Sequence, residues 1–348
     1  MNNTFYTQMH DLSLRCRSGM LALITHADDP QLIGQKAFLG SVHPLCEQPS
    51  LGDFWERFFS SLAPKEESLP CTVAFEGCSV FVERLSPKPQ LVILGGGHVA
   101  YAVYQLGCLL GFSITVVDDR EEFCNAQRFP NADTLCLPFA QALEQLPCDR
   151  STYYVIVTRG HQHDYECLAH LLRQPQGAYL GMIGSRRKRG LVHQALLEEG
   201  FTQEQIDTVH SPIGLAIGAQ TPEEIAVSIF AEIIQVKSSH HQDSCLEDPA
   251  LEMVCHADGP VALCTVIRKT GSIPRGAGSK MAVDQSGRTC GSVGGGKIEF
   301  DAICMAKKLC ETQDPQPIVT VFEMDNLSAQ DDGMICGGSA EVLIQLVK

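Results

Sequence analysis

Residues 90–100 read Gln-Leu-Val-Ile-Leu-Gly-Gly-Gly-His-Val-Ala, and this stretch decides the fold. An apolar run of strand length leads into three glycines, after which apolar residues recur at helical spacing. A second apolar run, Ile-Thr-Val-Val at 114–117, ends in Asp118, about 20 residues beyond the glycines. Strand, glycine turn, helix, strand and acid in this order are typical of a dinucleotide-binding unit, here written Gly95-x-Gly97-x-x-Ala100.

Strands and helices continue to alternate as far as residue 237. The last helix opens on Thr-Pro-Glu-Glu at 221–224, which combines an N-cap, a proline in the first turn and a capping glutamate. Such alternation predicts an α/β fold, with a Rossmann-like, doubly wound parallel sheet over residues 88–237. Residues 238–249 are polar and aperiodic, which predicts a linker.

The remaining segments are smaller. Residues 250–348 predict a Gly-rich α+β domain, with glycines gathered in loops at 271–278, 291–296 and 337–338. In the N-terminal α+β segment, 1–87, Gly-Met-Leu-Ala-Leu-Ile-Thr from residue 19 is similar to Gly-Pro-Val-Ala-Leu-Cys-Thr from residue 259. Because the N-terminal segment lacks the glycine loops, we interpret it as a degenerate, structural copy of the last domain.

Composition excludes several classes of protein. The 348 residues are 44% hydrophobic, which excludes a disordered chain, and the net charge of −15 speaks against a nucleic-acid-binding protein. No apolar run approaches the roughly 20 residues of a membrane span, and none near the N-terminus is long enough for a secretion signal. The 16 cysteines are scattered without a Cys-x-x-Cys pair, so we expect a cytoplasmic protein without a disulfide framework.

The glycine turn is the first candidate site. A backbone without side chains at Gly95, Gly96 and Gly97 can approach a phosphate at the start of the following helix, where His98 is a further candidate for cofactor binding. Asp118 and Asp119 would then face the ribose of NAD(P) or another nucleotide. The alternative is a Rossmann fold that binds no nucleotide.

Two further loops follow buried strands and should border the same crevice. Thr-Arg-Gly-His-Gln-His-Asp at 158–164 offers Arg159 for binding, and His161, His163 and Asp164 for proton transfer or a metal, although Asp164 could equally cap a helix. Gly-Ser-Arg-Arg-Lys-Arg at 184–189 predicts an anion site that includes Ser185, Arg186 and Arg187. A solvated helix face is the alternative for that run of charges.

The last domain adds candidates of its own. The glycines Gly294, Gly295 and Gly296 open a helix, and Arg275, Lys280 and Lys297 supply positive charge, which together predict an anion cradle. Glu299 could act as an acid or base, or could only complement the helix dipole. Cys336 lies between small residues in Ile-Cys-Gly-Gly, a setting that suggests chemistry rather than packing.

These motifs together resemble the XdhC/CoxI family of xanthine dehydrogenase accessory and carbon monoxide dehydrogenase maturation proteins. The resemblance rests on Leu-Val-Ile-Leu-Gly-Gly-Gly-His-Val-Ala, Thr-Arg-Gly-His-Gln-His-Asp, Gly-Met-Ile-Gly-Ser-Arg-Arg-Lys-Arg, Thr-Gly-Ser-Ile-Pro-Arg-Gly-Ala-Gly-Ser-Lys-Met and Gly-Ser-Val-Gly-Gly-Gly-Lys-Ile-Glu. It covers about residues 90–237 and 259–346. The family's usual order puts the Gly-rich domain before the Rossmann domain, whereas here the order is reversed.

The resemblance implies a maturation factor for a molybdenum hydroxylase, an accessory protein rather than a turnover enzyme. Such a protein binds a molybdopterin-type molybdenum cofactor, in mononucleotide or dinucleotide form, holds it during sulfuration or an analogous selenium step, and assists its insertion. It implies as partners the hydroxylase and a sulfur or selenium donor such as a cysteine desulfurase, and also a homodimer. Cys336 could then contact the cofactor's molybdenum.

Two other readings stay open. An NAD-dependent oxidoreductase with His161 or His163 as proton donor would explain Asp118 but not the glycine loops of the last domain. A purely scaffolding partner of the hydroxylase would leave the predicted anion sites unused.

Overall fold

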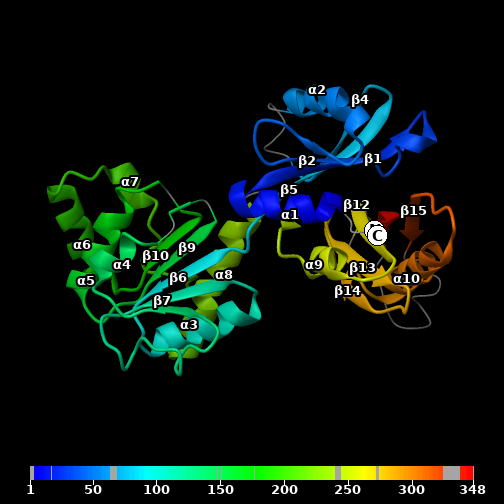
Figure 1. Cartoon of the computed structure of the whole chain (residues 1–348). Helices are drawn as coiled ribbons and strands as arrows, with labels where there is room; N and C mark the ends of the chain where they lie inside the picture. Colours follow the sequence, from blue (N-terminus) through cyan, green and yellow to red (C-terminus); the bar gives the residue numbers. More distant parts are fainter. Residues whose placement is uncertain are drawn as a thin grey trace. The chain divides into compact units, whose positions relative to one another are not determined.

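The computed structural model describes residues 4–16, 18–62, 69–146, 148–149, 151–175, 177–239, 244–271, 274–323 and 338–347. These residues belong to two units (Figure 1). Unit 2 is a single stretch of chain, residues 88–240, whereas unit 1 combines residues 1–87 with residues 241–348. That residues 1–87 and 250–348 are separate domains therefore stays a prediction.

Unit 2 contains a five-stranded parallel sheet in the order β10-β9-β6-β7-β8. Its strands are β6 (Gln90–Leu94), β7 (Ser113–Val117), β8 (Asp133–Leu135), β9 (Thr152–Ile156) and β10 (Tyr179–Met182). Its helices are α3 (His98–Leu109), α4 (Phe139–Leu143), α5 (His161–Leu171), α6 (Arg186–Glu198), α7 (Gln203–Asp207) and α8 (Pro222–Ser239).

Helices cover both faces of this sheet. Leu91 and Ile93 of the central strand β6 pack with residues of α3 and α8, whereas Val92 and Leu94 pack with residues of α4, α5 and α6 (Figure 1). Strand side chains alternate between faces, so a strand that is apolar at every position must be buried on both sides. The predicted Rossmann-like, doubly wound sheet is confirmed.

Unit 1 contains two sheets, antiparallel except for the parallel pairing of β11 with β5 in the first. The first is formed by β1 (Gly19–Ala27), β2 (Lys36–Leu39), β3 (Leu45–Cys46), β4 (Cys71–Phe75), β5 (Cys78–Ser86) and β11 (Ser244–Cys245), with helices α1 (Thr4–Cys16) and α2 (Gly52–Leu62). The second is formed by β12 (Val261–Gly271), β13 (Lys280–Asp284), β14 (Thr289–Gly291), β15 (Ile318–Glu323) and β16 (Gly338–Leu346), with helices α9 (Pro249–His256) and α10 (Gly296–Glu311). Two short 3-10 turns, Pro30–Leu32 and Pro49–Leu51, complete the unit.

The predicted linker at 238–249 is structured at both of its ends. Helix α8 extends to Ser239, and β11 pairs in parallel with β5, where it aligns Ser244 with Leu85. Pro249 already begins α9 behind an Asp248 cap, whose carboxylate accepts a hydrogen bond from the Ala250 N–H at 2.8 Å. Within the described residues, the polar composition of this stretch therefore reflects a strand pairing and a helix cap.

One of the hydrophobic cores of unit 1 is formed by side chains from both parts of the chain. A buried ion pair also joins the two parts: Lys280 Nζ donates to Glu83 Oε1 at 2.6 Å, to Glu83 Oε2 at 2.7 Å and to the Gly278 carbonyl at 2.9 Å. Ser244 Oγ adds a bond of 2.5 Å to Glu83 Oε2, and both charged side chains are only 1% exposed. Charges so buried are stable only when their bonding capacity is used, as it is here.

None of the 14 cysteines whose side chains the structure describes forms a disulfide. Burial raises the pKa of the Cys124 thiol to about 11 and that of Cys264 to about 12, so both are protonated and inert near neutral pH. No helix among the described residues is long and apolar enough to cross a membrane.

We predict that Lys280→Met lowers the free energy of unfolding of unit 1 by about 3–5 kcal/mol, because it leaves the Glu83 carboxylate buried without its partner. Urea unfolding followed by fluorescence would measure this, since the single tryptophan, Trp55, is fully buried in the same unit. Lys269→Met, which removes an exposed lysine, is the control. A loss no larger than that of the control would contradict a structural role for the ion pair.

Candidate functional site

In unit 1, the glycine turn contains three successive residues with positive φ. The third of them is the first residue of α10. Gly294, Gly295 and Gly296 have φ values of 143°, 76° and 59°, a conformation that side chains disfavour. The Glu299 carboxylate accepts hydrogen bonds from Ser292 Oγ at 2.5 Å and from the Gly295 N–H at 3.2 Å. Glu299 therefore stabilises the conformation of the turn. The sequence had suggested an acid or base, or a residue that complements the helix dipole, and neither alternative included this role.

The other predicted ligands of this domain are dispersed. Lys280 is buried in the ion pair described above and has no donor left for an anion. Arg275 is exposed on the loop before β13. Cys336, predicted to react or to contact molybdenum, lies outside the described residues.

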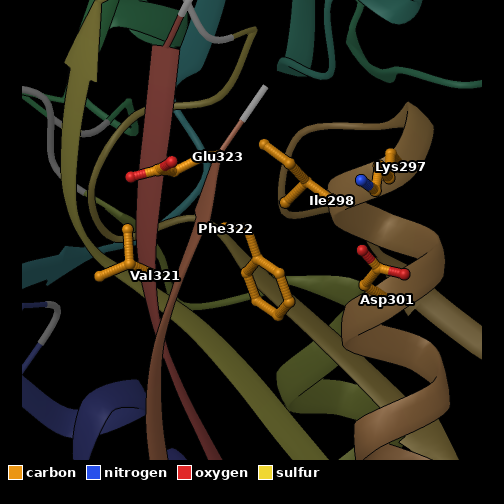
Figure 2. A pocket seen from close by; sticks show the side chains of 6 residues that line it. All are labelled: Lys297, Ile298, Asp301, Val321, Phe322 and Glu323. Atoms are coloured by element: carbon orange, nitrogen blue, oxygen red, sulfur yellow. The ribbon is translucent and has the colours of Figure 1, made fainter. Parts of the chain in front are cut away.

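A pocket of about 260 Å³ lies beside the glycine turn (Figure 2). Side chains of the first turns of α10 face Phe322 on β15, whose ring is directed toward the helix. Within the described part of the chain, Lys297 and Asp301 form no hydrogen bond or ion pair, so both remain available to a ligand. The full lining is Lys297, Ile298, Asp301, Val321, Phe322 and Glu323.

Asp301 and Phe322 were missed by sequence reasoning. Asp301 reads as one more solvent-facing charge on a helix, and Phe322 as one more apolar residue of a strand. Only the packing of β15 against α10 brings them together, and no local pattern encodes that packing.

In unit 2, the candidate site is the end of the sheet where the chain leaves β6 and β9, which is the place of the crevice expected for this fold. β6 lies between β9 and β7, so connections diverge to opposite sides at this point, which is where open α/β sheets bind ligands. A side chain at Gly95 would lie 2.5 Å from the Val157 carbonyl oxygen, and one at Gly96 would lie 2.1 Å from that of Phe123. At Gly97 there is nothing within 4 Å. Packing thus requires the first two glycines, and only Gly97 faces open space.

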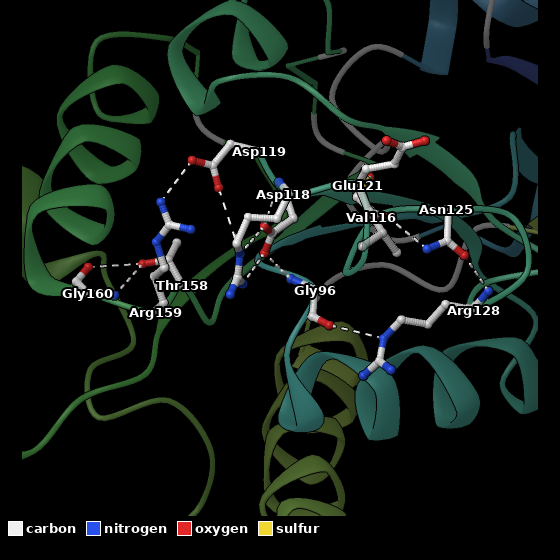
Figure 3. A network of polar contacts seen from close by, with 12 residues as sticks. Gly96, Val116, Asp118, Asp119, Glu121, Asn125, Arg128, Thr158, Arg159 and Gly160 are labelled. Carbon is white, nitrogen blue, oxygen red and sulfur yellow. Dashed lines mark hydrogen bonds and ion pairs between the residues drawn. The ribbon is translucent and has the colours of Figure 1, made fainter.

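Asp118 is already bound within the protein (Figure 3). It accepts hydrogen bonds from the Gly96 N–H at 2.8 Å and from the Arg120 guanidinium at 2.8 and 2.9 Å. Burial alone would raise the pKa of Asp118, but the hydrogen bonds from Arg120 and Gly96 outweigh it and hold the pKa below its ordinary value. A ribose could bind this carboxylate only by displacing Arg120.

Two more arginines border the glycine turn. Arg159 donates to Asp119 Oδ2 at 2.9 Å, which joins the ends of β9 and β7. Arg128 donates to the carbonyl oxygens of Gly96 at 3.2 Å and Gly97 at 3.4 Å (Figure 3). Arg128 and Arg120 were not among the predicted site residues, because no spacing rule marks an arginine that folds back onto a glycine turn.

The two histidines after β9 do not converge. Gly160 is the N-cap of α5, so His161, His163 and Asp164 lie in its first turn. His163 packs its ring against Phe139 and lies 3.5 Å from Glu166, whereas His161 is exposed. No three His, Cys, Asp or Glu side chains of the described residues could together hold a metal ion.

Asp164 is an internal partner rather than a helix cap. Its buried carboxylate accepts a hydrogen bond from Thr158 Oγ1 at 2.7 Å and forms an ion pair with Lys188. Ser185 caps α6 by accepting from the Lys188 N–H at 3.2 Å. The segments after β9 and β10 are therefore linked to each other at this end of the sheet.

The predicted anion site at the start of α6 retains part of its positive charge. Lys188 is paired as described, and Arg189 donates to the Ser211 carbonyl at 3.0 Å. Arg187 is exposed and has no salt bridge within the described residues, while the Arg186 side chain lies outside them. Arg187 and the Ser185-capped helix start are what an anion can reach.

Comparisons with known proteins match unit 2 and the C-terminal part of unit 1 to two separate family models. Residues 91–233 match the family model of the XdhC Rossmann domain, and residues 254–322 match that of the XdhC and CoxI family. A crystal structure of a xanthine dehydrogenase from Bacillus halodurans is 26% identical and aligns with 68% of this chain and 64% of its own, with a TM-score of 0.53.

Three curated proteins are similar over about half of this chain. The uncharacterized protein YqeB of Escherichia coli is 42% identical over 163 residues, 46% of this chain and 30% of YqeB. A protein of Bacillus subtilis described as a probable xanthine dehydrogenase component is 35% identical over 160 residues, 46% of either chain. The molybdenum cofactor insertion chaperone PaoD of Escherichia coli is 34% identical over 187 residues, 53% of this chain and 52% of PaoD. The chain thus spans about half or less of the length of these relatives.

The lowered pKa of Asp118 predicts a pH-dependent stability of unit 2. A carboxyl whose pKa is lower in the folded than in the unfolded chain stabilises the fold above its unfolded value, about 3.9, and this contribution is lost as the pH falls through the folded value. We expect Asp118→Asn to cost about 1–3 kcal/mol at pH 7, and the difference from wild type to shrink below pH 4. Urea unfolding followed by far-UV circular dichroism, at pH 7 and below pH 4, would measure the difference in the free energy of unfolding between the variant and wild type. Asp133→Asn, an exposed aspartate of the same unit, is the control, and a constant difference at all pH values would contradict the prediction.

Proposed function

This chain belongs to the XdhC and CoxI family, and on that premise we propose that it is a maturation factor for a molybdenum hydroxylase of the xanthine, aldehyde or carbon monoxide dehydrogenase type. It binds the molybdopterin cofactor as its cargo, holds it during sulfuration or a related step, and assists its insertion into the hydroxylase. The observation that carries the proposal is the 34% identity, over 187 residues, to a molybdenum cofactor insertion chaperone.

The crevice of unit 2 supports binding of the phosphate or nucleotide part of this cargo. Gly97 leaves open space at the start of α3, where backbone N–H groups favour an anion. Arg187 supplies a cation at the start of α6 that has no salt bridge among the described residues, and Arg159 is held by Asp119 at the ends of β9 and β7. Helix starts and guanidinium groups are the partners that phosphates prefer.

The same crevice gives less support to an NAD-dependent oxidoreductase. Asp118, which would have to bind the ribose, is engaged by Arg120 and by the Gly96 N–H. The two proposed proton donors also lie in different surroundings: His161 is exposed, whereas the His163 ring packs against Phe139. An accessory role that needs no positioned acid or base agrees better with this arrangement.

The wider setting belongs to the same proposal. The partners would be the hydroxylase, which receives the cofactor, and a sulfur or selenium donor such as a cysteine desulfurase. We propose that the protein acts in the cytoplasm, where the cofactor and its target would meet it, and that it works as a homodimer. Cys336 would contact the cofactor's molybdenum.

We expect the protein, purified without oxygen from a host that makes molybdopterin, to carry about one cofactor per chain. Molybdenum by mass spectrometry and fluorescence of the oxidised pterin would measure it. Replacing Arg159 and Arg187 together by alanine should remove most of the bound cofactor, because both follow strands, β9 and β10, at the carboxyl end of the sheet where the cofactor would bind. Arg288→Ala, which removes a 70% exposed guanidinium in unit 1, is the control for the loss of positive charge.

Two results would contradict the proposal. The first is a protein that is empty when purified and stays empty when cofactor is offered. The second is tight binding of a nicotinamide cofactor with hydride turnover, which would favour the oxidoreductase instead.

A further inference from the structure

The two sheets of unit 1 share one topology. The first runs in the order β3-β2-β1-β5-β4, with β11 added beside β5, and the second runs β14-β13-β12-β16-β15. In each, one helix follows the third strand of the set, α2 after β3 and α10 after β14. Matching strands therefore occur in the same chain order and have the same neighbours.

The hydrogen-bond register matches as well. The Ile24 N–H donates to the Gln35 carbonyl at 2.9 Å, and the Val266 N–H donates to the Ser279 carbonyl at 2.9 Å. In both sheets the pairing with the last long strand shifts directly after this residue. Ile24 thus corresponds to Val266. The sequence similarity described above would have matched Ile24 to the residue two positions before Val266.

This register places a lysine at the same position in both sheets. Lys36 and Lys280 each begin a strand, two residues after a left-handed glycine, Gly34 or Gly278, whose carbonyl accepts from the lysine Nζ. Glu83 and Gln345 also correspond, because Leu21 pairs with Glu83 and Leu263 with Gln345.

The contacts between the two sheets are reciprocal. Glu83 of the first sheet reaches Lys280 and Gly278 of the second. Gln345 of the second sheet lies at Gly34 of the first, where an added Cβ would be 3.1 Å from its Oε1. Two copies related by a two-fold axis make such exchanged contacts.

The correspondence also locates a counterpart of the pocket beside α10. Counted from the helix starts at Gly52 and Gly296, Arg57 matches Asp301 and Phe54 matches Ile298. Val73 and Thr320 pair with matching residues of the next strand, so Phe75 corresponds to Phe322 and Glu76 to Glu323.

In the first sheet this place is filled. Arg57 Nε and NH2 donate to the two carboxylate oxygens of Glu76 at 2.9 and 2.8 Å. Behind this pair, Phe75 contacts the rings of Phe54 and Phe58, each at 5.4 Å between centroids. The ion pair closes the rim, and aromatic rings occupy the interior.

At the matching positions of the second sheet, both closing elements are replaced by other residues. Ala302 takes the place of Phe58, which removes the ring that fills the interior. Asp301 takes the place of Arg57, so the rim carries two carboxylates, Asp301 and Glu323, that cannot pair. Among the described residues, these replacements leave the pocket between α10 and β15 open (Figure 2).

We propose that residues 19–86 and 261–346 are two paired copies of one fold, and that the pocket between α10 and β15 is a ligand site which only the second copy retains. Its ligand is a flat heterocycle with a guanidine-like edge, namely the pterin ring of the cofactor. The choice of pterin rests on the proposed function.

The first copy indicates why this chemistry fits. There a guanidinium group, that of Arg57, donates two parallel hydrogen bonds to the Glu76 carboxylate. The amino group and ring N–H of pterin present a similar pair of donors to a carboxylate such as Asp301. Phe322 and Ile298 offer apolar contact to the ring faces, and Lys297 can donate to its carbonyl.

The size of the pocket limits what it can hold. Pockets that enclose a whole drug-sized ligand measure about 300–1,000 Å³. At about 260 Å³ this one accommodates a bicyclic ring but not a complete nucleotide cofactor. The phosphate part would remain outside it.

Free pterin, titrated into the full chain and followed by its fluorescence, tests the proposal. We expect saturable binding with one site per chain, weakened about tenfold or more by Asp301→Asn, which removes the charge-assisted hydrogen bonds. Asp301→Arg should abolish binding, because the new side chain can pair with Glu323 as Arg57 pairs with Glu76.

Arg57→Ala is the matched control, since it alters the same position of the copy whose interior is filled, and it should leave pterin binding unchanged. Unchanged Trp55 fluorescence and urea midpoints would show that the variants are folded. No saturable binding by the wild type, or wild-type binding by Asp301→Arg, would overturn the proposal.

Cofactor retention separates this proposal from the proposed function. If the molybdenum cofactor copurifies equally with wild type and Asp301→Arg, the proposed function stands and this site is wrong. If pterin binds and Asp301→Arg abolishes it while no cofactor is ever retained, the site stands and the proposed function is wrong.

Discussion

The buried ion pair between Glu83 and Lys280 joins the two parts of unit 1 across almost 200 residues of sequence. Removing two charges from water costs several kcal/mol for each, so the pair must be complete in every hydrogen bond. Ser244 and the Gly278 carbonyl complete it. The strand that carries Ser244 follows unit 2 in the sequence, so the chain must return correctly from unit 2 before this core is finished.

This pair also makes the two matching parts non-interchangeable. In the first part, Lys36 forms an ion pair with Glu47, which follows β3. The residue of the second part that lies at this place is Gln345, which is uncharged. In the second, Lys280 has Glu83 as its only carboxylate partner among the described residues. Two second parts brought together on this face would set Lys280 against Gln345 and leave a buried lysine without a counter-charge. The surface therefore selects the first part as its partner.

Local patterns were predictable from the sequence, and distant partners were not. The turn at Gly95–Gly97 and the sheet around it were predictable, because strand, turn and helix are adjacent in the chain. Lys280 was assigned to a ligand site because its partner Glu83 lies in another part of the sequence. Asp164 was offered as a metal ligand or a cap, yet it is the buried partner of Lys188. In each case the charge was recognised, but the group that neutralises it could not be.

The two matching parts of unit 1 show how packing and a binding pocket exclude each other at one position of a fold. Helix α2 buries Trp55, Phe58 and Phe59, and burial of each large side chain contributes about 1.5–3 kcal/mol. Helix α10 has Ala302 and Ala306 at the positions of Phe58 and Leu62, which gives up part of that stabilisation and leaves space next to Phe322. A fold that had to supply both the stability and the pocket from one copy would compromise one of them. With the first part well packed and held to the second by Glu83, the second can keep an open, charged pocket without losing its structure.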